Sequence, residues 1–128
     1  MRFLLDTHTF LWWITDDPHL SERARQVISD PENDIFLSAA SGWEMAIKTQ
    51  LGKLQLPDRF EQFIAEQLFR NNITSLPVMM SHALHVQSLL LHHRDPFDRL
   101  LIAQGQLEKM PIITTDSVFA DYDVEIMW

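Results

Sequence analysis

Four carboxylates stand where an α/β protein can bring side chains together: Asp6, Glu44, Asp98 and Asp116. Three of them follow short apolar runs that predict buried strands, and Asp98 lies in the first turn of a predicted helix. Ligands of parallel sheets gather beyond the carboxyl ends of the strands. Carboxylates crowded at that edge repel one another unless a cation joins them, and oxygen ligands suit Mg²⁺ or Mn²⁺. The pattern therefore points to metal-dependent phosphoryl-transfer chemistry.

Each acid also has a purely structural explanation, and the residues alone leave both readings open. Asp, Ser and Thr are favoured at helix N-termini because their oxygens accept hydrogen bonds from free backbone amides. The expected caps are Asp6 for the first helix, Asp95 for the helix from Pro96, Asp116 for a turn at 117–120, and Glu44 in a capping box with Ser41.

The elements that must position these acids alternate along the chain, which predicts an α/β fold with a mostly parallel sheet. Strands are expected at 3–5, 35–37, 73–76, 111–115 and 124–128. Helices are expected at 7–14, after Ser21, at 43–52, from Pro57 to about 70, at 79–91 and at 96–109. The last helix should bury Leu100, Ala103 and Leu107 on one face.

Composition fits one domain over residues 1–128. The chain has 46% hydrophobic residues, few Gly and Pro, and no cysteine, which suits a reducing cytoplasm. No apolar run is long enough to cross a bilayer, so a soluble cytoplasmic protein is expected. The net charge of −8 disfavours non-specific nucleic-acid binding, unless the acids gather in a cation site or the partner is basic.

Several motifs resemble one known family. They are Leu4-Leu5-Asp6-Thr7-His8, Ser41-Gly42-Trp43-Glu44, the run from His93 to Gln104 (HRDPFDRLLIAQ), and Thr114-Thr115-Asp116. Together they resemble PIN-domain proteins, most nearly the VapC-type toxins of bacterial toxin–antitoxin pairs, over essentially the whole chain. The resemblance implies a three-layer α/β/α fold, Mg²⁺- or Mn²⁺-dependent endoribonuclease activity, and a homodimer neutralised by a cognate antitoxin, with DNA bound only through that antitoxin.

The resemblance places the acidic quartet of the family on Asp6, Glu44, Asp98 and Asp116. It implies that three aspartates hold the principal ion and that Glu44 binds a second ion or positions water. RNA would then be hydrolysed by metal-activated water rather than by the ribose hydroxyl, leaving 5′-phosphate and 3′-hydroxyl ends.

Residues beside the quartet have two readings each. Asp95 is a fifth, outer acid or a helix cap, and the cap is preferred. Lys48, four residues after Glu44, forms an exposed ion pair or neutralises the site. The others either support the acids and the substrate or serve locally as caps and surface pairs: Thr7, Ser38, Thr115, Arg94 and Arg99.

Aromatic and histidine residues are read mainly as structural. Trp12, Trp13 and Trp43 have the helical spacing of core residues, although a stacking role stays open. His82 and His85 lack further partners at zinc-binding spacing. His92 and His93 are expected at the surface or at the edge of a substrate site.

Two rival functions stay open. A haloacid-dehalogenase-type phosphatase also begins with an Asp after a strand, but that chemistry needs a second carboxylate two residues on, where this chain has His8. A non-catalytic binding or inhibitory module would use the acids only as caps. In the toxin reading, an antitoxin would lay a helix or tail in an apolar groove and insert a basic side chain among the acids.

Overall fold

The computed structural model describes residues 1–128. Five short strands alternate with six α-helices: β1 (Arg2–Leu5), α1 (Thr7–Ile14), α2 (Glu22–Ser29), β2 (Asp34–Ser38), α3 (Ala39–Gln50), α4 (Phe60–Arg70), β3 (Ile73–Leu76), α5 (Met80–His85), α6 (Pro96–Glu108), β4 (Ile112–Ile113) and β5 (Ile126–Met127). Two 3₁₀ turns, η1 (Val86–Ser88) and η2 (Ser117–Asp121), complete the chain.

The strands form one sheet in the order β3-β2-β1-β4-β5, and every pair is parallel. After β1 the chain builds outward through β2 and β3, then returns to place β4 on the other side of β1. The order therefore reverses between β1 and β4. In an open α/β sheet, this reversal leaves a crevice at the carboxyl ends of the two strands, where ligands bind.

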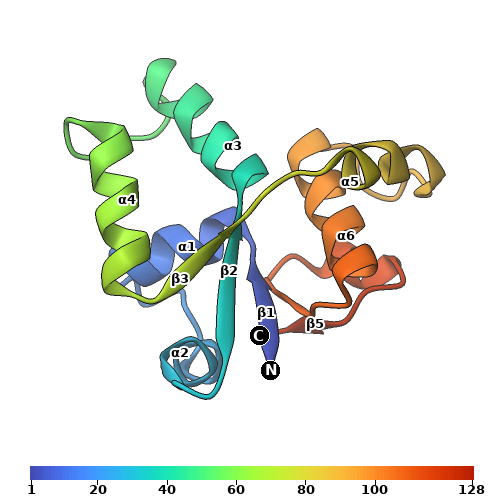
Figure 1. Ribbon diagram of the computed structural model, residues 1–128, viewed down its shortest axis with the longest axis horizontal. Coiled ribbons are helices and arrows are strands. Elements are labelled where there is room, and N and C mark those ends of the chain that lie inside the picture. Colours follow the sequence, from blue (N-terminus) through green and yellow to red (C-terminus); the bar gives the residue numbers. More distant parts are fainter.

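Helices cover both faces of the sheet, giving the predicted three layers (Figure 1). The figure shows α1, α2 and α4 on one side of the strands and α5 and α6 on the other. Alternate residues of β1 enter the two cores: Phe3 and Leu5 pack with the first layer, and Leu4 packs with the second. A strand apolar on both sides is what burial between two helical layers requires.

Helix α6 carries clear start and stop signals. Asp95 accepts hydrogen bonds from the amides of Phe97 and Asp98, Pro96 occupies the first turn, and Lys109 ends the helix in the left-handed conformation at φ 55°. A Cβ added to Gly105 would lie 2.9 Å from Val124 Cγ2 and 3.0 Å from Ile112 Cδ1. The missing side chain therefore lets α6 approach β4 closely.

Several expected boundaries need correction. Helix α4 begins at Phe60 rather than Pro57, since Arg59 adopts a left-handed conformation (φ 60°). The helix expected at 79–91 is only α5 followed by η1, and β4 and β5 have two residues each. No helix of the chain is both long and apolar enough to span a bilayer.

The predicted buried face of α6 is only partly confirmed: Ala103 is buried and Leu100 is half-buried. Leu107 is 42% exposed, whereas Leu101, Ile102 and Gly105 are buried together with Arg99 and Gln104. Because α6 contacts α3 and α5 as well as the sheet, its buried surface is wider than one amphipathic stripe.

Candidate active site

Asp6 lies at the crevice between β1 and β4. It directly follows β1 and is buried, and its Oδ2 accepts a hydrogen bond of 2.8 Å from Thr114 Oγ1, just beyond β4. Asp6 is the N-cap residue of α1, as expected, but its side chain makes no capping hydrogen bond. Burial raises the pKa of the Asp6 carboxyl, and the charge of Glu44 adds to this, although the Thr114 hydrogen bond opposes it.

Glu44 reaches the same place from the second turn of α3. Its Oε2 accepts a 2.7 Å hydrogen bond from Lys48 Nζ, and this bond is the main cause that raises the pKa of Lys48. Its Oε1 is buried and has no hydrogen-bond partner. The expected capping box is wrong, because α3 already begins at Ala39 and Ser41 lies inside it.

Asp98, in the first turn of α6, is the most perturbed acid. Burial is the main cause that raises its pKa to about 8, and the charges of four other acids add to the effect: Asp6, Asp95, Glu44 and Asp116. The four acids that the sequence singled out therefore lie near enough for the charges of the other three to act on Asp98.

Asp116 and His93 close the cluster. Asp116 Oδ1 accepts from the amide of Val118 and caps η2, as expected, while Oδ2 lies 3.1 Å from His93 Nε2. The same nitrogen lies 2.9 Å from Asp98 Oδ2. One ligand atom from each of these three residues lies within 4.8 Å of the others.

The donor set fits a divalent cation. Carboxylate oxygens predominate, which hard ions such as Mg²⁺ and Mn²⁺ prefer. Lys48 is the one ammonium group paired with this cluster, and Glu44 Oε1 remains a buried acceptor without a donor. A buried carboxylate oxygen without a partner is costly, and a cation would satisfy it.

Comparison with known proteins agrees with this geometry. The sequence profile of the PIN domain matches residues 3–125. The chain belongs to the PIN domain family. A relative from Mycobacterium tuberculosis, Ribonuclease VapC16, is 38% identical over 61 residues, which are 48% of this chain and 43% of the relative. The aligned part is thus less than half of that protein.

Solved structures share the PIN fold over nearly the whole chain. VapBC2 from Rickettsia felis, bound to a DNA fragment from its promoter, matches with a TM-score of 0.69 at 14% identity, covering 100% of this chain and 98% of that one. FitAcB from Neisseria gonorrhoeae matches with a TM-score of 0.62 at 18% identity, covering 100% and 97%. FitAB bound to an IR36 DNA fragment gives 0.65 at 20% identity, covering 99% and 94%. The family match leaves the phosphatase alternative without support.

Among the flanking residues of this PIN domain, some serve as caps. Ser38 caps α3 through the amide of Ala40, and Asp95 caps α6, which is the preferred reading of that acid. Thr7 donates to Ser41 Oγ and so ties the start of α1 to α3.

One flanking prediction needs correction, and two are left as predictions. Thr115 is exposed, so a contact with phosphate stays a prediction, while its neighbour Thr114 makes the hydrogen bond to Asp6. Arg99 is buried and donates to the carbonyls of Val86, Leu89, Leu90 and His93, so it supports the loop before α6 and does not face RNA. Arg94 remains exposed, as a substrate contact requires.

The predictions for the histidines and tryptophans also have mixed outcomes. His82 binds Glu108 and His85 binds Gln106, so the two do not form a zinc site. Trp12 and Trp13 pack against the core, whereas Trp43 is 62% exposed and rests on Phe97. His93 was expected at the surface or a substrate edge; its place between two acids was missed, and its only sequence signal is its position two residues before Asp95.

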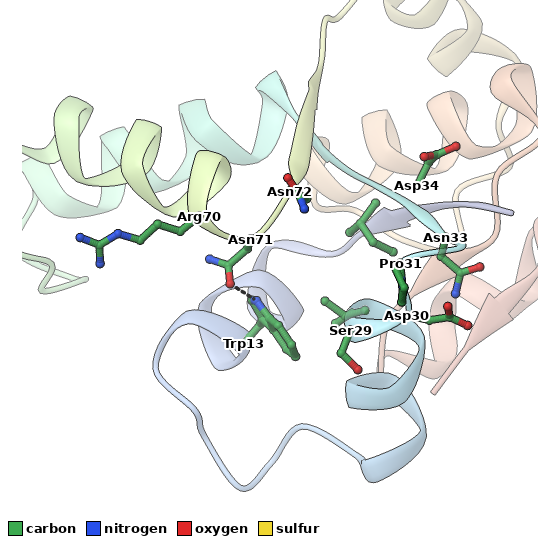
Figure 2. A pocket seen from close by; sticks show the side chains of 11 residues that line it. Trp13, Ser29, Asp30, Pro31, Asn33, Asp34, Arg70, Asn71 and Asn72 are labelled. Atoms are coloured by element: carbon green, nitrogen blue, oxygen red, sulfur yellow. Dashed lines mark hydrogen bonds between the residues drawn. The ribbon is translucent and has the colours of Figure 1, made fainter.

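Two hollows of similar size flank α1. One, of about 460 Å³, lies at the amino ends of β2 and β3. Figure 2 shows the side chains that line it, among which Trp13 Nε1 donates to Asn71 Oδ1. This hollow therefore lies at the end of the strands opposite to the carboxyl ends, where the acids are. The other, of about 440 Å³, adjoins the acid cluster through Thr7 and Lys48, and its lining also includes Trp12, Lys53 and Leu54.

Proposed function

We propose that this PIN domain is a metal-dependent endoribonuclease and the toxin of a toxin–antitoxin pair. The observation that carries the proposal is the crowding of four carboxylates at one end of the sheet, where burial, and then the charges of the neighbouring acids, raise the pKa of Asp98 to about 8. The name of the relative VapC16, a ribonuclease, supports the same chemistry. The VapC-type motifs and the likeness to the VapBC2 and FitAB structures support the toxin role.

The cation would be Mg²⁺ or Mn²⁺, held by Asp6, Asp98 and Asp116. When bound, it supplies charge that polarises a phosphodiester and makes water more acidic. The buried Oε1 of Glu44 has no donor of its own, so it can accept the proton of an attacking water or hold a second ion. Lys48 holds the Oε2 of Glu44 through its 2.7 Å bond, and Thr114 fixes the orientation of Asp6.

RNA would reach the acids along the hollow beside α1. A basic rim of Lys48 and Lys53 and an apolar wall containing Trp12 and Leu54 suit a phosphate and a base, respectively. Lys53 is exposed and forms no ion pair. Lys53→Glu should therefore weaken RNA binding uniformly across sequences and lower the salt slope by about one unit. An unchanged salt dependence of RNA binding in Lys53→Glu would contradict this route for RNA to the acids.

A cognate antitoxin is the proposed protein partner, and the toxin would act as a homodimer in the cytoplasm. A basic side chain from the antitoxin would relieve the same crowding that the cation relieves, which suits a chain of net charge −8. DNA contact would come through the antitoxin only. Co-purification with the product of a neighbouring gene, and loss of RNA cleavage when the two are mixed, would test this.

The direct test of the activity maps cleavage ends in total RNA with Mg²⁺ or Mn²⁺. The wild type should leave 5′-phosphate ends that can be ligated to an adaptor, and both excess EDTA and Asp98→Asn should abolish them. Full activity in EDTA, or 2′,3′-cyclic ends, would exclude this mechanism. Growth arrest that survives Asp6→Ala and Asp98→Ala would instead favour the non-catalytic module.

A further inference from the structure

The placement of His93 raises a question that the distances alone do not answer. Its Nε2 lies 2.9 Å from Asp98 Oδ2 and 3.1 Å from Asp116 Oδ2, close enough to act as a third ligand of a shared cation. A metal-binding imidazole nitrogen must be free of its proton. The protonation of the opposite ring nitrogen therefore decides what His93 can do.

That opposite nitrogen is occupied. His93 Nδ1 lies 3.2 Å from the backbone nitrogen of Asp95, which can only donate. Nδ1 is therefore an acceptor, and in a neutral ring the proton resides on Nε2. Nε2–H then points between the two carboxylates as a donor and is not available as a ligand.

The ring is also held in place by groups outside the acid cluster. The backbone amide of His93 donates to Tyr122 Oη at 2.7 Å, and its carbonyl accepts from Arg99 at 3.3 Å. Tyr122 Oη donates in turn to the carbonyl of Leu90 at 2.7 Å. Phe119 packs edge-on against the imidazole, at 5.8 Å between ring centroids. The backbone of His93 is therefore fixed, and turning the ring over would break the hydrogen bond between Nδ1 and the amide of Asp95.

We infer that His93 is a fixed hydrogen-bond donor that positions the metal-binding carboxylates of Asp98 and Asp116, and that it is not itself a ligand. Asp95 acts with it, since its backbone amide sets the tautomer while its side chain caps α6. The inference rests on the metal site proposed above. It assigns the residues before α6 a role in setting the spacing of the two ligands.

Mn²⁺ bound to the full chain provides the test without any RNA. Pulsed EPR of the wild type should show no directly coordinated nitrogen. His93→Ala should weaken Mn²⁺ binding by about tenfold, the loss typical when the partner of a metal ligand is removed. His93→Gln can place an amide N–H near the lost Nε2–H and should restore most of the affinity. His19→Ala, at an exposed histidine paired with Asp17, is the matched control.

A strong nitrogen coupling to Mn²⁺ that disappears in His93→Ala would overturn the inference, because His93 would then be a ligand. Unchanged affinity in His93→Ala would overturn it as well. If His93→Ala fails to fold, ¹⁵N shifts of the metal-free wild type still decide, since protonated Nδ1 contradicts the assigned tautomer. Absence of RNA cleavage with intact Mn²⁺ binding would reject the proposed nuclease function and leave this assignment standing.

Discussion

Replacing Asp98 with asparagine should stabilise the metal-free protein while abolishing its activity. The change keeps the shape of the side chain and an oxygen that can accept from His93 Nε2, which lies 2.9 Å away. It removes the charge that burial and neighbouring acids oppose. Natural sites of this kind give up stability for function, so one substitution should move the two properties in opposite directions.

The pKa of Asp98 sets the size and sign of the effect. In the unfolded chain the carboxyl loses its proton near pH 3.8, whereas the folded protein keeps it to about pH 8. Between these values the folded state binds more protons, so stability falls as pH rises. At about 1.4 kcal/mol per pKa unit, the upper limit is roughly 6 kcal/mol. Partial solvent access and movement of the neighbouring groups reduce the expected gain at pH 8 to about 1–3 kcal/mol.

Thermal unfolding in EDTA measures this directly. The Asp98→Asn variant should melt roughly 3–10 °C above the wild type at pH 8. The two should converge near pH 4, where the unfolded carboxyl begins to hold its proton. With Mn²⁺ the difference in melting temperature should become smaller or change sign, because only the wild type keeps all the metal ligands. RNA cleavage by the variant should fall by at least about 100-fold, since loss of a ligand exceeds the 10–100-fold cost of losing an outer partner.

Asp123→Asn is the matched control. Asp123 is an exposed carboxylate before β5, at the sheet edge opposite the acids, and its removal should change stability by no more than about 0.5 kcal/mol. If Asp98→Asn melts at or below the wild type in EDTA throughout pH 4–9, the acids are not crowded as described. Retained cleavage by that variant would place catalysis elsewhere.

Four further outcomes are expected. Thr114→Val removes the 2.8 Å donor to Asp6 and should weaken Mn²⁺ binding by about tenfold in calorimetry. Arg99→Lys replaces a forked donor to four carbonyls with a single ammonium and should cost about 2–4 kcal/mol in urea unfolding, with faster amide exchange over residues 86–93. Gly105→Ala should cost about 1 kcal/mol net, because overpacking of about 1–3 kcal/mol against Ile112 and Val124 exceeds the gain of about 1 kcal/mol in helix propensity. Mn²⁺ binding should release more protons from Asp98 at pH 7, where the carboxyl is mostly protonated, than at pH 9, where it is mostly ionised. Calorimetry in buffers of different ionisation enthalpy measures this release, and equal release at both pH values would contradict the raised pKa.

The strands, and the acids that follow them, could be predicted because both depend on local pattern. Apolar runs ending at Asp6 and shortly before Asp116 indicate strands whose carboxyl ends meet in a parallel sheet, and the structure has them on neighbouring strands. Glu44 was harder, because the Ser-x-x-Glu spacing also fits a capping box. Only the earlier start of α3, at Ala39, moves Glu44 from the helix terminus into the site.

The loop before α6 could not be predicted, because long-range contacts set its shape. Tyr122 holds the amide of His93 from 29 residues away, and Arg99 reaches back to four carbonyls. Because Arg99 follows a predicted site acid, the sequence suggests that it contacts phosphate. Its burial among backbone carbonyls shows instead that it is structural. Similarly, the tandem threonines 114 and 115 look equivalent in sequence, and only the course of the chain after β4 turns Thr114 toward Asp6.

The net negative charge of the chain does not exclude RNA as a substrate when the charge of the acid cluster is considered by itself. Asp6, Glu44, Asp98 and Asp116 with Lys48 give a formal local charge of −3, from four negative groups and one positive group, or −2 while Asp98 keeps its proton. A divalent cation that displaces this proton brings the formal charge from −3 to −1, and a second one makes it positive. An RNA phosphate is then repelled most strongly by the empty site, less when one cation is bound, and attracted when two are bound. Metal binding should therefore precede productive RNA binding, and the net charge of −8 makes that order stricter rather than excluding the substrate.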